Sequence, residues 1–361
     1  MKTRFAATRH ALLTFAVLLL PALLFWQSEA AMDGIRQGLS LCGQTLLPSL
    51  FPFLVLSELL IAMGVGRLLG KLLGKPVKAL FGLSAQGATV LLLGALCGQP
   101  VATVSALALH RRSEMEKEEL GHLLLFANNP SSGFLIGAVG NGLFGNKSIG
   151  AALFCITWFS AAIVGIALRF LRRNPSEIPN IPQNGIKKAA SVSLITDAVR
   201  QGFFAMLQIC AFVLFFSCIA SCVTPIAEAL SLPPIARVAI YGLLELSSGI
   251  SHAFTILPPI TTFRAAAFFS GFAGLSVCLQ IFSIAEGSGM RIAPYLLAKL
   301  TQGALCLLLA ELYLRLLRPS ITLQHAVGSF AARDTATWLP ALLCFVFILA
   351  LAFFKRKKEA P

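Results

Sequence analysis

Two long apolar segments between residues 85 and 143 are each interrupted in the middle by polar residues. The first reads AQGATVLLLGALCGQPVATVSALAL and breaks at 97–100 (CGQP), and the second reads LGHLLLFANNPSSGFLIGAVGNGL and breaks at 128–133 (NNPSSG). In lipid, each unpaired backbone group costs several kcal/mol, so a broken helix persists only inside protein or beside a polar cavity. Two neighbouring breaks therefore predict a binding site near the middle of a bilayer.

The composition indicates an integral membrane protein. Mean hydropathy is +0.82, and 57% of the 361 residues are hydrophobic while 12% are charged. Soluble domains carry about 25% charged residues, and the apolar runs here recur at roughly 20 residues, enough to cross a membrane. The net charge of +14 does not indicate nucleic-acid binding, because the basic residues lie in short loops between apolar spans, where they orient a membrane protein.

The apolar pattern divides the chain into five parts. Residues 1–34 form either a first transmembrane helix or a signal peptide, since a basic start precedes an apolar run and Ser28-Glu29-Ala30 fits a cleavage site. The remaining parts are a first repeat at 35–172, a cytoplasmic linker at 173–190, a second repeat at 191–318, and a transmembrane helix with a basic tail at 319–361.

The order span, half-length hairpin, broken span, span occurs twice, at 37–171 and at 202–317. In the second copy the hairpin 236–257 is broken at Ser247-Ser248-Gly249, and the span 264–283 is loosened near Ser270-Gly271 and Gly274. Eight crossings place the copies in opposite orientations, with both termini in the cytoplasm beside most of the 29 Lys and Arg residues. The predicted fold is an all-α polytopic membrane protein with two inverted repeats, each containing a re-entrant helical hairpin and a discontinuous transmembrane helix.

Starts of half-helices inside the bilayer suit an anionic or planar solute. Pro100 and Pro130 fit the first position of a helix, and Asn129 precedes Pro130 as an N-cap. Free N–H groups and the positive end of the helix dipole attract carboxylates. The expected solute-binding residues are Gln99, Pro100, Asn128, Asn129, Ser131, Ser132, Ser247, Ser248 and Ser270. Alternatively, these polar residues only satisfy the broken helix ends against one another.

Glu245 lies in the apolar run YGLLELSSG, where an ionisable group is costly and indicates function. It would bind a coupling cation, carry a proton, or pair with Arg237 or Arg264 as a structural strut. His252 follows the break and would share a proton with Glu245, or serve only in packing.

No motif indicates an enzyme or a metal site. His-Glu-x-x-His, Gly-x-Ser-x-Gly and Walker A sequences are absent, and no Cys/His cluster has metal-ligand spacing. Glycines such as Gly137, Gly140 and Gly142 instead fit close packing of helices. We expect no cofactor.

Three stretches carry a resemblance to a known family: RQGLSLCGQTLLPSLFPFLVLSELLIAMG, GALCGQPVAT and FANNPSSGFLIGAVG. Together they resemble the YlbJ-type sporulation integral membrane proteins, part of a group with a nucleoside-recognition (gate) domain whose fold is similar to concentrative nucleoside transporters. The resemblance covers roughly residues 35–315. It departs at the hairpin tip, where Gly98-Gln99 is followed by Pro100-Val101 rather than by Thr-Glu, which argues against a nucleoside substrate and a shared sodium site.

The resemblance implies a sporulation-associated transporter that moves dipicolinate across the outer forespore membrane. The alternatives are a nucleoside or nucleobase transporter, or a non-transporting membrane scaffold needed for assembly of the spore cortex or coat. Expected partners are a small-molecule substrate and the lipid bilayer, with a homo-oligomer or contacts to other sporulation membrane proteins left open.

Overall fold

The computed structural model describes residues 18–63, 65–171, 192–321 and 323, and this part of the chain is helical without a strand. Its elements are α2 (Ser28–Leu41), η1 (Cys42–Leu46), α3 (Leu47–Ala62), α4 (Val65–Phe81), α5 (Ala85–Cys97), α6 (Val101–Arg111), α7 (Lys117–Ala127), η2 (Gly133–Leu143), α8 (Lys147–Leu171), α9 (Val192–Ala229), α10 (Pro234–Leu244), α11 (Leu246–Ile256), α12 (Pro259–Phe272), α13 (Gly274–Ile284) and α14 (Ile292–Leu317). The all-helical prediction is confirmed. The predicted linker 173–190 and last span lie outside the described residues.

Four helical stretches of the described residues are long and apolar enough to cross a membrane: Lys147–Leu171, Val192–Ala229, Pro259–Ile284 and Ile292–Leu317. A fifth candidate is the bent pair Leu73–Phe81 and Ala85–Cys97, whose axes differ by 92°. Large apolar side chains of α9, such as Phe203, Phe204 and Leu207, are exposed on the surface, as suits contact with lipid rather than water.

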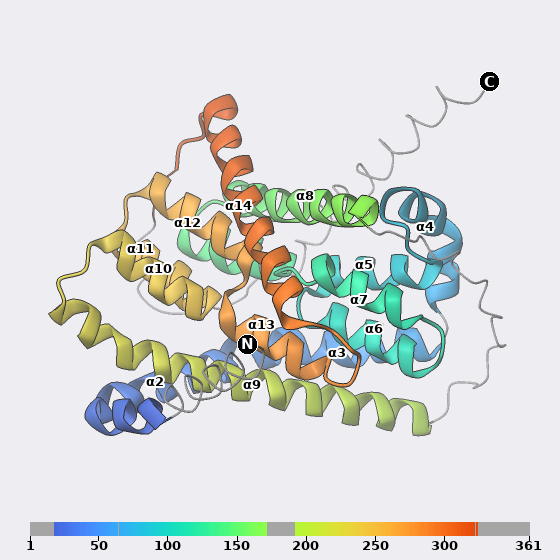
Figure 1. Cartoon of the computed structure of the whole chain (residues 1–361), viewed down its shortest axis with the longest axis horizontal. Helices are drawn as coiled ribbons and strands as arrows, with labels where there is room; N and C mark the ends of the chain where they lie inside the picture. The colour runs from blue at the N-terminus through green and yellow to red at the C-terminus, as the bar shows by residue number, and fades with distance from the viewer. Residues whose placement is uncertain (1–17, 64, 172–191, 322, 324–361) are drawn as a thin grey trace, which may run out of the picture.

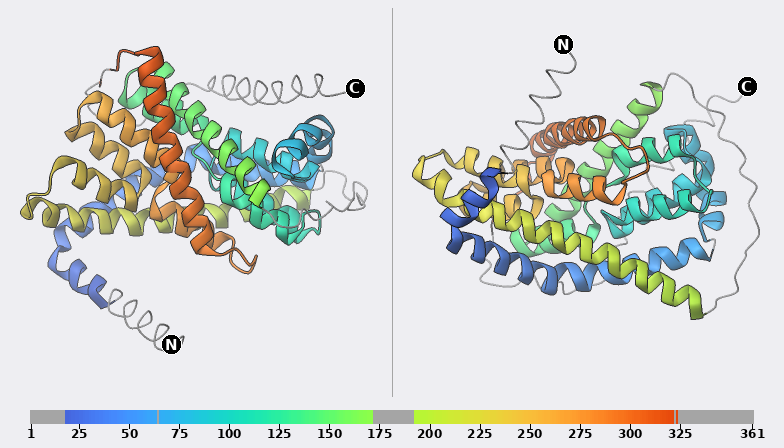
Figure 2. Two further views of the ribbon diagram at one scale, coloured as in Figure 1. Left: turned by 45° about the horizontal axis from the view of Figure 1, so that its top comes forward. Right: turned by 60° about the horizontal axis from the view of Figure 1, so that its bottom comes forward.

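The long helix α9 runs antiparallel to α2 and α3 and forms one side of the molecule with them (Figures 1 and 2). Glycine makes this contact close: a Cβ atom at Gly34 would lie 2.6 Å from the Ser217 carbonyl oxygen. Farther along the same contact, a Cβ atom at Gly202 would lie 2.9 Å from a Val55 methyl group. This layer covers the helices that are broken.

Four helix pairs are interrupted: α5/α6 and α7/η2 before α8, then α10/α11 and α12/α13 before α14. In the described residues, two interrupted helix pairs followed by one long helix therefore occur twice. In the second copy the positions of the two breaks match the prediction only in part. The hairpin breaks at Glu245 rather than at Ser247-Ser248-Gly249. The span breaks at Ala273-Gly274, so the prediction is confirmed at Gly274 and wrong at Ser270-Gly271, which lie inside α12. Ala273 (φ 73°) and Gly274 (φ 80°) are both left-handed, which ends one helix and begins the next.

Both hairpins fold back on themselves at small residues. In α5/α6, a Cβ atom at Gly94 would lie 3.0 Å from the Ala102 Cβ. In α10/α11, Gly249 lies directly against Gly242, where any side chain would collide with the backbone of the facing helix. Each hairpin thus has its tip at the break and its open side at the other end.

The contacts between the copies define two ends of the molecule. At the first end, Gly289 in the α13–α14 loop contacts Lys117 at the start of α7. At the second end, the Phe144 ring after η2 lies 6.2 Å from Phe254 of α11 and 6.3 Å from Phe263 of α12. The α5/α6 hairpin therefore opens toward the first end, through Arg111, and α10/α11 opens toward the second.

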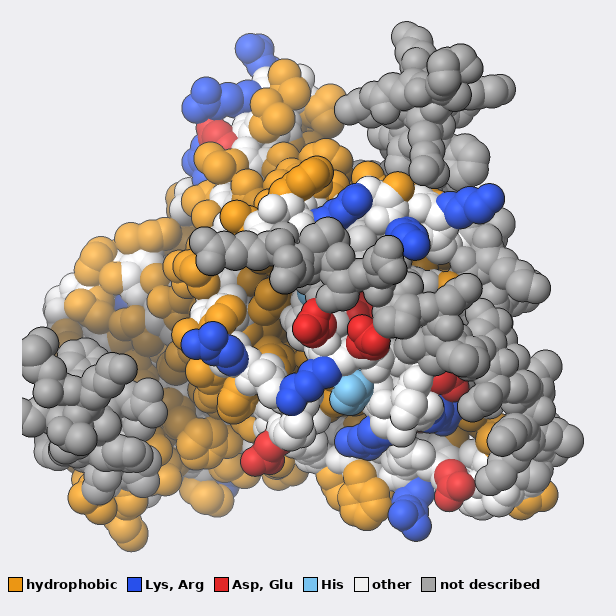
Figure 3. All heavy atoms as spheres, turned by 45° about the vertical axis from the view of Figure 1, so that its right-hand side comes forward, with side chains coloured by type: hydrophobic (Ala, Val, Ile, Leu, Met, Phe, Trp, Pro, Cys, Tyr) orange, Lys and Arg blue, Asp and Glu red, His pale blue; other side chains and the backbone are white. Residues whose placement is uncertain are grey.

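Charged side chains gather at the first end, which faces the viewer in Figure 3. The exposed charged residues there include Arg111, Lys117, Glu118, Glu286 and Arg291. Hydrophobic side chains dominate the surface to the left of this face. A polar end beside an apolar flank is the pattern of a protein that sits in a bilayer.

The π-helix η2 packs on α8 through glycine. A Cβ atom at Gly140 would lie 2.5 Å from the Gly150 Cα, so the prediction of close packing is confirmed at Gly140. It is wrong for Gly137, which has open space around it, and for Gly142, whose nearest neighbour is the carbonyl oxygen of Gly137 in its own helix.

Candidate functional site

The two breaks of the first copy contact each other directly. The Gln99 backbone N–H at the hairpin tip donates to the Asn129 carbonyl oxygen at 2.8 Å. The Thr103 hydroxyl on α6 donates to Asn128 Oδ1 at 2.7 Å. A Cβ atom at Gly98 would lie 2.6 Å from the Ser131 backbone N, so only glycine lets the tip approach this closely. The structure therefore brings together Gln99, Asn128, Asn129 and Ser131, four of the residues expected at the site.

Two side chains of α14 reach into this break. Lys299 Nζ lies 2.8 Å from the Asn128 carbonyl oxygen, 2.8 Å from Gln302 Oε1 and 3.5 Å from Asn129 Oδ1. Gln302 Nε2 donates to Asn129 Oδ1 at 2.6 Å and to the Thr157 carbonyl oxygen of α8 at 3.2 Å. Asn128, Asn129, Lys299 and Gln302 are all 0% exposed. We call these four residues the Lys299 cluster.

The side-chain amides of Asn128 and Asn129 hydrogen-bond to the C-terminal end of α7 rather than to the start of the next helix. The C-terminal carbonyl groups of a helix lack partners within it. Asn128 Nδ2 donates to the Leu124 carbonyl oxygen at 3.1 Å and Asn129 Nδ2 to that of Phe126 at 2.8 Å. The expected N-cap role of Asn129 is therefore wrong, because its side chain faces backward along the chain.

The proline positions also differ from the prediction. The helix after the Asn128–Asn129 break begins at Ser132, so Pro130 lies in the non-helical segment before it. The Ser131 hydroxyl accepts the Phe134 N–H at 3.2 Å and supplies the cap expected from Asn129. Pro100 is the residue before α6 rather than its first helical residue. Ser132 is buried.

In the second copy, Glu245 caps α11 with its own side chain. Its carboxylate accepts the backbone N–H groups of Ser247 at 2.9 Å and Ser248 at 2.6 Å. The N–H groups expected to receive a solute carboxylate are therefore occupied. No ion pair joins Glu245 to Arg237 or Arg264 among the described residues. Arg264 instead pairs with Glu311 at 2.7 Å.

Ser270 and His252 make local contacts. The Ser270 hydroxyl is fully buried and donates to the Ala266 carbonyl oxygen of its own helix at 2.6 Å. The His252 ring lies 4.1 Å from the Tyr241 ring, edge to face, on the facing helix of the hairpin. His252 Nε2 is buried without a hydrogen-bond partner within the described part of the chain. Neither side chain contacts Glu245 through a hydrogen bond.

The break between α12 and α13 lies between Glu245 and the Lys299 cluster. A Cβ atom at Gly271 would lie 2.9 Å from the Gln302 carbonyl oxygen, and one at Gly274 would lie 3.1 Å from the Glu245 Cα. Backbone packing thus connects Glu245 with the Lys299 cluster. No hydrogen bond among the described residues joins Glu245 to Lys299 itself. The four breaks form one continuous region inside the molecule.

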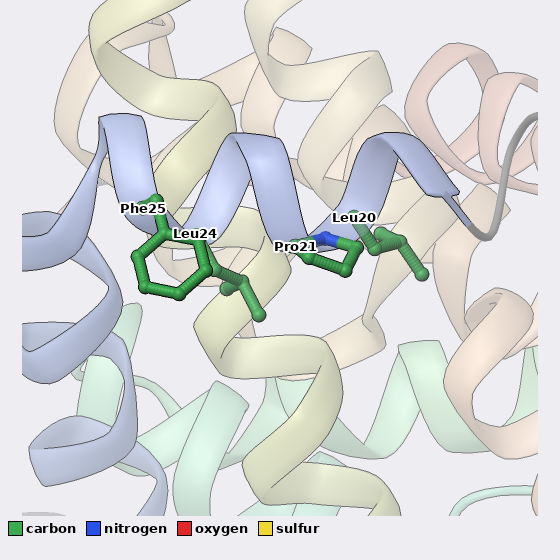
Figure 4. A pocket seen from close by; sticks show the side chains of 4 residues that line it. All are labelled: Leu20, Pro21, Leu24 and Phe25. Carbon is green, nitrogen blue, oxygen red and sulfur yellow. The ribbon is translucent and has the colours of Figure 1, made fainter.

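The Lys299 cluster is closed to solvent in the structure. An apolar hollow of about 430 Å³ lies elsewhere, lined by Leu20, Pro21, Leu24 and Phe25 (Figure 4). Phe25 is 85% exposed, so the hollow lies on the outer surface. No group of three or more His, Cys, Asp or Glu residues in the described ranges could hold a metal ion.

The sequence prediction missed Lys299, Gln302 and Thr103. The signal for Lys299 was present, because an ionisable residue inside an apolar span indicates a functional site. Lys299 is the eighth residue of α14. A lysine this close to the end of a span can extend its ammonium to the membrane interface, so its position alone did not indicate a buried site. Only the tertiary contacts show that it points inward.

The chain is 25% identical over 340 residues to the sporulation integral membrane protein YlbJ of Bacillus subtilis (strain 168), covering 85% of this chain and 83% of that protein. No family model matches the chain, and neither does a solved structure. The apolar helices and the name of this relative both indicate a membrane protein. The chain is an integral membrane protein, and its similarity to YlbJ supports the YlbJ-type sporulation family.

Proposed function

We propose that this protein is a transporter that moves a small anionic or planar solute across a membrane during sporulation, through the region where the four helix breaks meet. The observation that carries the proposal is the contact between the two copies at the Asn128–Asn129 break, where Lys299 and Gln302 on α14 of the second copy bond to the break of the first. Discontinuous helices that meet inside the bilayer form solute and ion sites in many secondary transporters.

The arrangement of the two hairpins supports inverted repeats with re-entrant hairpins. One hairpin opens toward the first end and the other toward the second, while their tips lie at the breaks. Such a pair gives a solute a separate gate on each side of the membrane. We propose no catalytic step, since gating and binding account for the buried polar residues.

The charge of the region favours an anion. The Lys299 ammonium has three uncharged oxygens as partners, so its charge is not balanced by a direct contact. At low dielectric this charge attracts an anion over several ångströms. Dipicolinate, the solute implied by the resemblance to YlbJ-type proteins, is a planar dicarboxylate and suits this field.

Transport by the purified protein tests the proposal. We expect liposomes that contain the protein and trap terbium ions to gain luminescence when dipicolinate is added outside, whereas protein-free liposomes stay dark. Asn129→Ala and Glu245→Gln should each slow this uptake, because both side chains hold a break in place. Thr301→Ala is the matched control, since Thr301 is exposed and bonds only to its own helix.

Two outcomes would contradict the proposal. Uptake of uridine without uptake of dipicolinate would favour a nucleoside transporter. Folded protein that admits neither solute would favour the scaffold.

A further inference from the structure

The Lys299 ammonium occupies a cage made by three segments of the chain. The Asn128 carbonyl oxygen, Asn129 Oδ1 and Gln302 Oε1 surround it at 2.8, 3.5 and 2.8 Å. An ammonium group has three N–H donors, and each has an oxygen here. The position is fully buried. No donor is left to hydrogen-bond a solute, so Lys299 can act on a solute only through its charge.

The cage has the chemistry of a cation site. All three oxygens are uncharged, and one is the carbonyl of an unwound residue directly after α7 ends at Ala127. The C-terminal end of a helix carries a partial negative charge that favours cations. Unwound carbonyl groups and the C-terminal ends of half-helices are the groups that hold Na⁺ or H⁺ in transporters with discontinuous helices.

Hydrogen bonds made by Gln302 hold its own oxygen in position in the cage. Its Nε2 donates to Asn129 Oδ1 and to the Thr157 carbonyl oxygen, which fixes Oε1 toward the ammonium. The Thr103 hydroxyl likewise fixes Asn128 through Oδ1. These side-chain contacts hold the oxygens in place independently of the ammonium, so the cage would persist if the ammonium were removed.

We propose that this cage is a monovalent-cation site whose resident cation is the Lys299 ammonium, so that the protein needs no sodium, and that removing the ammonium lets Na⁺ bind there. Hard cations such as Na⁺ take oxygen ligands of this kind, and a shortened side chain leaves room for the ion and water. The inference does not depend on which solute is moved, or on transport at all.

Thermal unfolding of the purified full-length protein in detergent tests this inference. Melting temperatures are compared in NaCl, KCl and choline chloride at equal ionic strength. The wild type should melt at the same temperature in all three salts. Lys299→Ala and Lys299→Ser should melt several degrees higher in NaCl than in choline chloride, because an ion that binds only the folded state stabilises it by mass action.

Two matched variants separate the cage from other effects. Lys299→Met fills the space with an apolar chain of similar length and should show no sodium response. Lys147→Ala removes an exposed lysine at the start of α8 and should behave as the wild type. Radiolabelled Na⁺ should bind saturably to Lys299→Ala and Lys299→Ser, and to none of the other proteins.

Each other result overturns the inference. A Na⁺-specific rise in the wild type would show that the cage still requires sodium. Lys299→Ala and Lys299→Ser proteins that fold but ignore Na⁺ would show that the oxygens do not form a cation site. Failure of both variants to fold even in NaCl would count equally against it, since Na⁺ is expected to replace the ammonium. Because no solute is used, these results stand apart from the transport assay.

Discussion

At the scale of single residues, the interior is organised by polar side chains that bond to broken helix ends. Gln302 makes three such bonds, because its amide accepts from Lys299 and donates to Asn129 and Thr157. A buried polar group that loses its partner costs about 1–3 kcal/mol, and more when the group is charged. The stability of the closed form should therefore depend strongly on this one amide.

Gln302→Leu should lower the free energy of unfolding by about 3 kcal/mol or more, because it leaves both the Lys299 ammonium and the Asn129 Oδ1 atom short of a partner. Denaturant or thermal unfolding in detergent measures the change. Thr301→Ala is the control, since its hydroxyl is exposed and bonds to Leu297 of the same helix. Equal stability of the Gln302→Leu protein and the wild type would mean that the amide contacts add nothing.

Glu245→Ala should destabilise the protein by about 1–2 kcal/mol, the usual effect of removing an N-cap, because the N–H groups of Ser247 and Ser248 lose their acceptor. Glu245→Gln should cost less, since one amide oxygen can still accept. Glu228→Gln, at an exposed position, serves as the control. If Glu245→Gln were as damaging as Glu245→Ala, the charge would matter rather than the cap.

At the scale of elements, the sequence indicated where helices break in the first copy and was less accurate in the second. Pro and Asn residues mark the breaks at Pro100 and Asn128–Asn129, because proline cannot continue the backbone hydrogen bonds of a helix. Neither residue type marks Glu245, and at Ala273 the signal is the glycine that follows it, Gly274. There the break is fixed by a side-chain cap and by a left-handed alanine, both of which depend on tertiary packing.

The candidate site was predictable in the first copy but not where α14 contributes to it. The cluster of Gln99, Asn128, Asn129 and Ser131 follows from polar residues in apolar runs, a local signal. Lys299 and Gln302 lie far along the chain from that break, and their inward orientation depends on how α14 packs on α7 and α8. Sequence reasoning from one span at a time does not contain that information.

Gly140→Ala should destabilise the protein markedly, because the new Cβ would lie 2.5 Å from the Gly150 Cα and would separate η2 from α8. Overpacking of this kind costs about 1–3 kcal/mol or more. Gly137→Ala in the same helix is the matched control, since its position is open. Unfolding of both variants in detergent measures the difference, and equal stability would exclude a tight η2–α8 contact.

At the scale of the whole molecule, the two ends are distinguished by which loops meet. The α6–α7 and α13–α14 loops lie together at the first end, and the residues after η2 lie beside α11 and α12 at the second. The charge pattern of the sequence predicts that the first end faces the cytoplasm. The membrane sidedness of these loops can be measured directly.

Cysteines introduced at Glu118 and Glu286 should react with a membrane-impermeant maleimide only from the cytoplasmic side. Cysteines at Lys147 and Thr255 should react only from the opposite side. The four positions are exposed, and the measurement uses a background in which the nine native cysteines are replaced. Labelling of positions 118 and 147 from one side would mean that α7 and η2 do not cross the membrane together.

The carboxylate of Glu245 has a further consequence for how an anion would travel. Its oxygens already accept the Ser247 and Ser248 N–H groups, so a free carboxylate that reached the start of α11 would have to displace the Glu245 side chain. The two copies would then differ in how they bind an anion. A solute anion would bind beside the first copy, and it would reach the start of α11 in the second copy only after the Glu245 side chain rotates away.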